Sequence, residues 1–195
     1  MIPESLQVIE GSDHLYAIRR TKPSRPGYLL LVKTIGRERE IITELIAQWA
    51  LHGAFYLIAA GEWLPDHDDV RYSVYRYTTA IDETLNSLIL ARPFTCFQLL
   101  DLLMEAGRQN KPVLILDFLH LFYDADIELS LRQRVLDQCC HYTKRLSSSG
   151  LVAVLVPTMS VEAYRRFFPV LAAVADEILE TGKQQETELI QGLLF

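Results

Sequence analysis

The fold of this chain is decided by one stretch, Pro112-Val-Leu-Ile-Leu-Asp-Phe-Leu-His-Leu-Phe-Tyr-Asp124. A long apolar run interrupted by a single carboxylate is typical of a strand buried on both faces, as in a parallel sheet covered by helices. A buried carboxylate is costly unless something pairs with it, so we expect Asp117 where the strand emerges, at its carboxyl end. Open α/β sheets bind ligands at that edge. The stretch therefore predicts a central strand over 113–122 that ends at a candidate site.

Similar apolar runs recur on both sides of this stretch, separated by amphipathic patterns of helical period. Strands are expected over 28–32, 54–60, 85–91, 151–156, 176–179 and 189–194. Helices are expected over 37–51, from a Thr95 capping box to Gly107, over 129–146 and over 160–175. Residues 70–79 fit either a helix begun by an Asp-rich cap or a strand. The alternation predicts an α/β fold, a three-layer αβα sandwich with a mainly parallel central sheet.

Length and composition favour one soluble domain. The 195 residues suffice for a single well-filled core, and half of them are hydrophobic. We expect one domain over 1–195, with a lead-in over 1–25 and an edge hairpin over 181–195. The net charge of −6 argues against a pervasive nucleic-acid or membrane coat. We see neither a signal peptide nor a membrane span, and we expect a cytoplasmic protein.

The three cysteines, Cys96, Cys139 and Cys140, are odd in number and form no CxxC pattern. This spacing argues against both a disulfide framework and a zinc site.

Six segments of the chain follow one another in an order that can be compared with known α/β folds. They are 28–32 with its turn and helix, Leu57-Ile-Ala-Ala-Gly-Glu62, Leu88-Ile-Leu-Ala-Arg-Pro-Phe-Thr95, Val113-Leu-Ile-Leu-Asp117, 151–156 and Asp176-Glu-Ile-Leu179. In this order the chain resembles the RecA-like core of P-loop ATPases, which includes the RecA and RadA recombinases and their paralogues. The resemblance implies that 28–32 is the phosphate-loop strand and that 113–117 is a Walker B-like strand.

The loop after the first of these strands departs from that family. A Walker A loop, G-x-x-x-x-G-K-[ST], cradles phosphates with backbone N–H groups and neutralises them with its lysine. Residues 32–40 instead read Val-Lys-Thr-Ile-Gly-Arg-Glu-Arg-Glu, with one glycine and no Gly-Lys-Ser/Thr. Glu38 and Glu40 occupy the helix start where phosphate would sit and satisfy the helix dipole themselves. We therefore expect no usual ATP hydrolysis, and neither ATP nor magnesium as a resident cofactor.

Several residues keep the chemistry of a binding site without its motif. A residual anion site would use four residues around the first turn: Lys33, Thr34, Gly36 and Arg37. By resemblance, Asp117 and Glu62 stand at the Walker B and water-activating positions, and we interpret both as vestigial and assign no catalytic residue.

A cluster of positive charge precedes the first core strand: Arg19, Arg20, Lys22 and Arg25. We favour a solvated loop, and the alternative is a phosphate-contacting patch for DNA.

The resemblance implies a non-catalytic paralogue that acts as an oligomerising or partner-binding scaffold, in DNA recombination or repair. Its partner would be a second copy or an active RecA-like ATPase. One alternative is a magnesium-dependent nuclease or phosphatase that uses strand-end and loop carboxylates. These carboxylates are Glu62, Asp66, Asp117, Asp124, Asp126 and Glu128. Another alternative is a regulatory signalling module of RecA-like type.

Overall fold

A computed structural model describes residues 6–8, 27–34, 39–61, 64–159 and 162–180, and these residues form an α/β sandwich. Within these ranges, seven strands lie in the order β1-β7-β2-β6-β5-β3-β4, and every neighbouring pair is parallel. The strands are β1 (Leu6–Val8), β2 (Tyr28–Thr34), β3 (Phe55–Ala59), β4 (Leu88–Ala91), β5 (Val113–Leu116), β6 (Leu151–Pro157) and β7 (Glu177–Glu180). The predicted parallel sheet is thereby confirmed.

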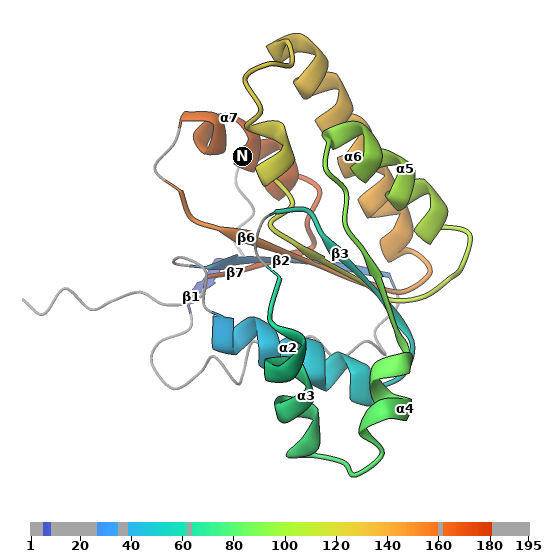
Figure 1. Cartoon of the computed structure of the whole chain (residues 1–195). Coiled ribbons are helices and arrows are strands. Elements are labelled where there is room, and N and C mark those ends of the chain that lie inside the picture. Colours follow the sequence, from blue (N-terminus) through green and yellow to red (C-terminus); the bar gives the residue numbers. More distant parts are fainter. Residues whose placement is uncertain (1–5, 9–26, 35–38, 62–63, 160–161, 181–195) are drawn as a thin grey trace, which may run out of the picture.

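Helices cover both faces of this sheet (Figure 1). On one face lie α2 (Arg39–Leu51), α3 (His67–Tyr75) and α4 (Ile81–Asn86). On the other lie α5 (Cys96–Ala106), α6 (Leu129–Ser147) and α7 (Glu162–Ala172), with a short 3₁₀ helix, η2 (His120–Phe122), before α6. Each face closes over its own apolar cluster, so the central strands β2, β6, β5 and β3 are buried on both sides.

The order of the strands creates a divergence near the middle of the sheet. The chain leaves β2 into α2 on one face, whereas it leaves the neighbouring β6 toward α7 on the other face. Ligands of open α/β sheets bind in the crevice that such diverging connections leave at the carboxyl ends of the strands. We call this part of the molecule the carboxyl edge.

The predicted strand over 113–122 is wrong in its second half. β5 ends at Leu116, and Asp117 takes a left-handed backbone with φ of 56°. The chain then turns into η2, and Phe118, Leu119 and Phe122 point into the core. Periodicity could not distinguish the two structures, because a buried turn and a buried strand are equally apolar.

Three other boundaries differ from the prediction. Of the two alternatives for residues 70–79, the structure has the helix, which ends at Tyr75 as part of α3; the N-cap Asp66 accepts a bond from the backbone N–H of Asp68 at 3.0 Å. The strand predicted over 85–91 is shorter, because α4 extends to Asn86 and β4 follows. The strand predicted over 176–179 corresponds to β7 (Glu177–Glu180), which lies inside the sheet and pairs with both β1 and β2.

The capping box at Thr95 forms as predicted, with a small shift. Thr95 Oγ1 accepts from the N–H of Gln98 at 3.2 Å, and the Gln98 side chain accepts from the N–H of Phe94 at 2.7 Å.

Cys96, Cys139 and Cys140 are buried and not disulfide-bonded. The predicted lead-in over 1–25, apart from β1, and the predicted hairpin over 181–195 lie outside the described residues. No helix of the described ranges is long and apolar enough to cross a membrane.

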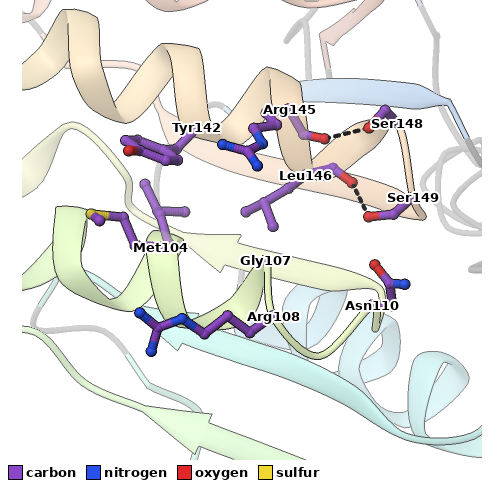
Figure 2. Close-up of a pocket in the computed structure, with 10 residues that line it drawn as sticks. Met104, Gly107, Arg108, Asn110, Tyr142, Arg145, Leu146, Ser148 and Ser149 are labelled. Atoms are coloured by element: carbon purple, nitrogen blue, oxygen red, sulfur yellow. Dashed lines mark hydrogen bonds between the residues drawn. The ribbon is translucent and has the colours of Figure 1, made fainter.

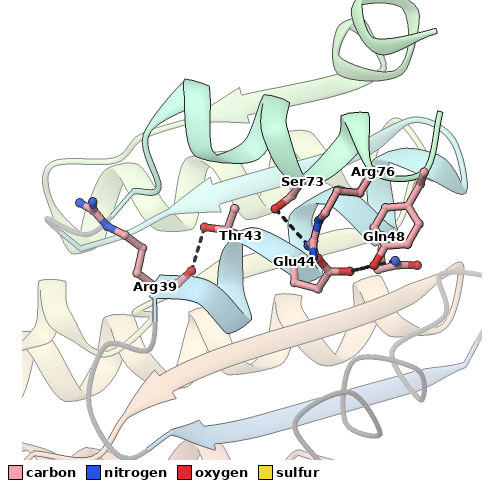
Figure 3. Close-up of polar contacts among 7 residues, drawn as sticks. Arg39, Thr43, Glu44, Gln48, Ser73 and Arg76 are labelled. Atoms are coloured by element: carbon pink, nitrogen blue, oxygen red, sulfur yellow. Dashed lines mark hydrogen bonds and ion pairs between the residues drawn. The ribbon is translucent and has the colours of Figure 1, made fainter. Parts of the chain in front are cut away.

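A buried carboxylate joins α3 to α2 (Figure 3). Glu44 receives bonds from Arg76, from the Tyr77 hydroxyl at 2.5 Å and from Gln48 Nε2 at 3.0 Å. The bond to Glu44, followed by burial, raises the pKa of Tyr77. Because a buried charge is costly unless it is paired and hydrogen-bonded, this cluster fixes the end of α3 against α2.

Candidate functional site

The carboxyl edge brings together the candidate residues that lie at strand ends. Lys33 and Thr34 end β2, and Asp117 follows β5, with β6 between the two strands. Two inter-strand spacings separate these strands, about 10 Å. Backbone bonds hold the three strands level here: Thr158 N–H donates to Thr34 O at 2.7 Å, and Asp117 N–H donates to Leu155 O at 2.9 Å. The two candidate groups thus share an edge without touching each other.

The ammonium group of Lys33 already has an ion-pair partner within the protein. Its Nζ lies 2.6 Å from Oε1 of Glu180, the residue opposite it on β7. The same Nζ lies 5.7 Å from the ring centroid of Phe168 on α7, within the range of a cation–π interaction. Both charged side chains are about three-quarters buried. An incoming anion would therefore have to compete with a carboxylate that the sheet register holds in place.

Asp117 is packed tightly against the end of β3. Its side chain is 5% exposed, and a Cβ built on Gly61 would lie 2.1 Å from its Oδ2. Only a glycine at position 61 leaves room for this carboxylate, because real Cβ atoms do not approach so closely. The left-handed backbone of Asp117 is tolerated by aspartate better than by most residues. The position at a strand end agrees with the prediction, and the close approach of β3 was not predicted.

The turn after Asp117 adds a histidine that the sequence prediction placed inside a strand. His120 Nδ1 lies 3.7 Å from Asp117 Oδ2, too far for a hydrogen bond but close for a charge interaction. The Tyr123 ring meets the His120 ring edge-on at 6.4 Å between centroids. Burial, followed by the Asp117 charge, raises the pKa of Tyr123. The spacing Asp-x-x-His becomes informative only once a turn is known to follow the strand.

No protein-family model matches the chain, and no curated protein matches it.

The remaining predicted site residues do not extend this site. Glu62, Gly36 and Arg37 lie outside the described residues, as do all four basic residues of 19–25. The carboxylates proposed for a metal are dispersed where the structure describes them. Asp66 caps α3, and Asp124 accepts from the backbone N–H of Asp126 in an exposed turn at 2.9 Å. In the described part of the chain, no three His, Cys, Asp or Glu side chains converge as metal ligands.

A pocket of about 380 Å³ lies at the opposite, amino edge of the sheet (Figure 2). It is formed by the ends of α5 and α6, with Met104 and Arg108 on one side and Tyr142 and Arg145 on the other. The hydroxyl of Ser148 donates to the Arg145 carbonyl at 2.7 Å. Because helix carboxyl ends carry partial negative charge, two of them beside two arginines give no net preference for an anion.

A second candidate region is apolar, and sequence analysis missed it. It comprises β4 (88–91) with Phe94 and Phe97, and we call it the β4 edge. Leu90 is 48% exposed, Phe94 75% and Phe97 41%, although residues of these types are usually buried. Within the described residues, β4 pairs only with β3. An apolar run predicts burial, and only the strand order reveals that this one lies at the rim.

Proposed function

We propose that this chain is a RecA-like paralogue that does not hydrolyse ATP and serves as a protein-binding scaffold. The observation that carries the proposal is the ion pair between Lys33 and Glu180. In a working phosphate loop the cation must be available to the triphosphate. Here the cation at the end of the candidate phosphate-loop strand is paired with a carboxylate that is 147 positions away in the sequence but lies opposite it on the neighbouring strand β7.

The strand order supports the RecA-like part of the proposal. A phosphate-loop strand and a Walker B-like strand must end at the same edge if they are to serve one magnesium–nucleotide complex. β2 and β5 do so, with only β6 between them. Asp117 follows β5 as the Walker B-like resemblance requires, but it is buried against Gly61. This combination is expected of a fold that keeps its framework after the site has lost its use.

The scaffold part of the proposal is supported by the β4 edge. Exposed large apolar side chains that gather in one region mark surfaces for protein contact. The setting in DNA recombination or repair, with an active RecA-like ATPase as partner, is proposed from the resemblance alone.

The test is a calorimetric titration of the purified protein with magnesium-ATP, together with a turnover assay. We expect neither micromolar binding nor turnover in the wild type. Turnover that disappears in Asp117→Asn would overturn the proposal. Glu180→Gln is the informative variant: if the ion pair is what occupies Lys33, this variant gains weak phosphate binding, and Glu180→Gln combined with Lys33→Met loses it again.

A partner test is independent of nucleotide. RecA-like ATPases from the same genome are co-expressed with this chain one at a time, and complex formation is measured by size-exclusion chromatography with light scattering. A stable complex with one of them supports the scaffold. If the chain binds neither those ATPases nor itself, the scaffold is refuted.

A further inference from the structure

The β4 edge lacks the features that normally protect the rim of a sheet. Rim strands are usually blunted by charged side chains, proline or bulges, since their free backbone groups can pair with another chain. β4 reads Leu-Ile-Leu-Ala, with none of these inside it. Pro93 lies two residues beyond the strand and limits further pairing to these four residues. The rim therefore offers a short, apolar strand with one open side.

A pocket beside this strand gives a second observation. A cavity of about 240 Å³ lies between β4, α4 and the start of α3, with a mostly apolar lining. Leu88 and Leu90 border it from the strand, and Leu64, Val70 and Leu85 border it from the other elements. An apolar side chain from a second strand laid along β4 would meet this cavity, because Leu88 and Leu90 share one face of the strand.

Residues of opposite charge lie on the two sides of β4 in the sequence. Exposed Arg92 directly follows the strand, and exposed Glu83 lies in α4, the helix that precedes the strand. Within the described part of the chain neither residue has an ion-pair partner. When two copies of β4 pair antiparallel about Ile89 or Leu90, Arg92 of each copy lies beside residues 86–88 of the other. Glu83 stands one helical turn before Asn86, within reach of that arginine.

From these observations we propose that the β4 edge is a two-fold interface on which a second copy of this chain docks. The two β4 strands pair antiparallel, the two sheets become continuous, and Arg92 of each copy meets Glu83 of the other. A two-fold interface uses the same patch twice, which is why a patch carrying its own complementary charges fits a second copy. The axis stands perpendicular to the sheet, so that α5 of each copy lies on the same face of the joined sheet, and exposed Phe97 is available to extend the contact. This contribution is needed, because stable interfaces bury at least about 1,000 Å² and four strand residues supply less.

This inference names the partner for the proposed scaffold and rests on that function only for its biological use. The experiment is sedimentation velocity of the full chain across the micromolar range. We expect a reversible dimer, and Leu90→Asp is expected to raise its dissociation constant at least about tenfold. Arg165→Glu, an exposed charge reversal on α7, is the matched control and is expected to leave the dimer unchanged.

The charge pair tests the arrangement itself. Arg92→Glu and Glu83→Arg each bring like charges together and weaken the dimer, whereas the double variant restores it. A wild-type monomer, an unaffected Leu90→Asp dimer or a double variant without recovery would overturn the proposal. A monomer would leave the nucleotide prediction standing, so the two proposals fail separately.

A second measurement covers the case in which Leu90→Asp does not fold. Leu90→Cys under mild oxidation is expected to form a disulfide-linked dimer, because residues near the axis face their own copies, and the three native cysteines are buried. Ala173→Cys, on an exposed turn after α7, is the control and is expected to stay monomeric on a non-reducing gel. Equal cross-linking of both variants would contradict the interface.

Discussion

The carboxyl edge of the sheet holds charged side chains buried against the protein itself, whereas the β4 edge holds apolar side chains exposed to water. At the first, Lys33 meets Glu180 and Asp117 fits against Gly61. At the second, Leu90 and Phe94 have large exposed fractions. The comparison shows that the charged side chains at one edge of a sheet can be buried by contacts within the protein while apolar side chains at another edge remain exposed. It also predicts that the first region contributes to folding and the second to association.

The largest effect on folding is expected from Gly61→Ala at the carboxyl edge. The added methyl would collide with the Asp117 carboxylate and cost about 3 kcal/mol in the free energy of unfolding, measured by urea denaturation. Gly150→Ala is the matched control, since its Cβ would meet Pro112 N at 3.6 Å, an ordinary contact. Combining Gly61→Ala with Asp117→Gly should recover most of the loss. An equal cost in both backgrounds would show that the two residues do not oppose each other.

The next effect is a loss of stability at alkaline pH. Burial raises the pKa of Tyr164 from 10.0 to about 12. The unfolded chain releases this proton first, so the stabilisation is complete below pH 10 and is lost as the pH rises toward 12. The loss amounts to roughly 3 kcal/mol for a shift of this size. Tyr164→Phe should flatten the alkaline part of the stability profile, and Tyr72→Phe on exposed α3 is the control.

A smaller effect is expected from the Lys33–Glu180 pair. Glu180→Gln should lower the free energy of unfolding by about 1 kcal/mol, because the pair is partly exposed and hydrogen-bonded. A double-mutant cycle with Lys33→Met isolates the interaction. If the cycle gives no coupling energy, the pair does not stabilise the carboxyl edge, and the main support for an occupied Lys33 is lost.

The smallest effect on folding is expected at the β4 edge. Leu90→Thr should change the stability of the isolated chain by no more than about 0.5 kcal/mol, measured at a concentration where dimers are absent. Leu57→Thr, at the buried position opposite Leu90 on β3, should cost several times as much. Similar costs for the two variants would mean that Leu90 is part of the folding core and would remove the contrast between the two regions.

Local patterns in the sequence were enough for most of the framework. The Thr95 capping box, the amphipathic helices and the aliphatic strands each depend on residues a few positions apart. The structure confirms them within the described ranges, with shorter strands than predicted over 113–122 and 85–91. Asp117 directly follows the end of β5 as expected, but its carboxylate is buried there and does not emerge from the fold. The absence of a Walker A motif is visible in the sequence alone. What it implies for nucleotide binding stays a prediction.

Only the tertiary structure decided which residues of the two regions contact each other and which stay exposed. Lys33 and Glu180 lie 147 positions apart, and their contact depends on the pairing of β2 with β7. The approach of Gly61 to Asp117 depends in the same way on β3 lying beside β5. The sequence predicted a strand over 85–91 without its neighbours, and the place of β4 at the rim of the sheet left it partly exposed. Short-range patterns determine which elements form, but the neighbours of a strand are set by long-range packing, which no local pattern encodes.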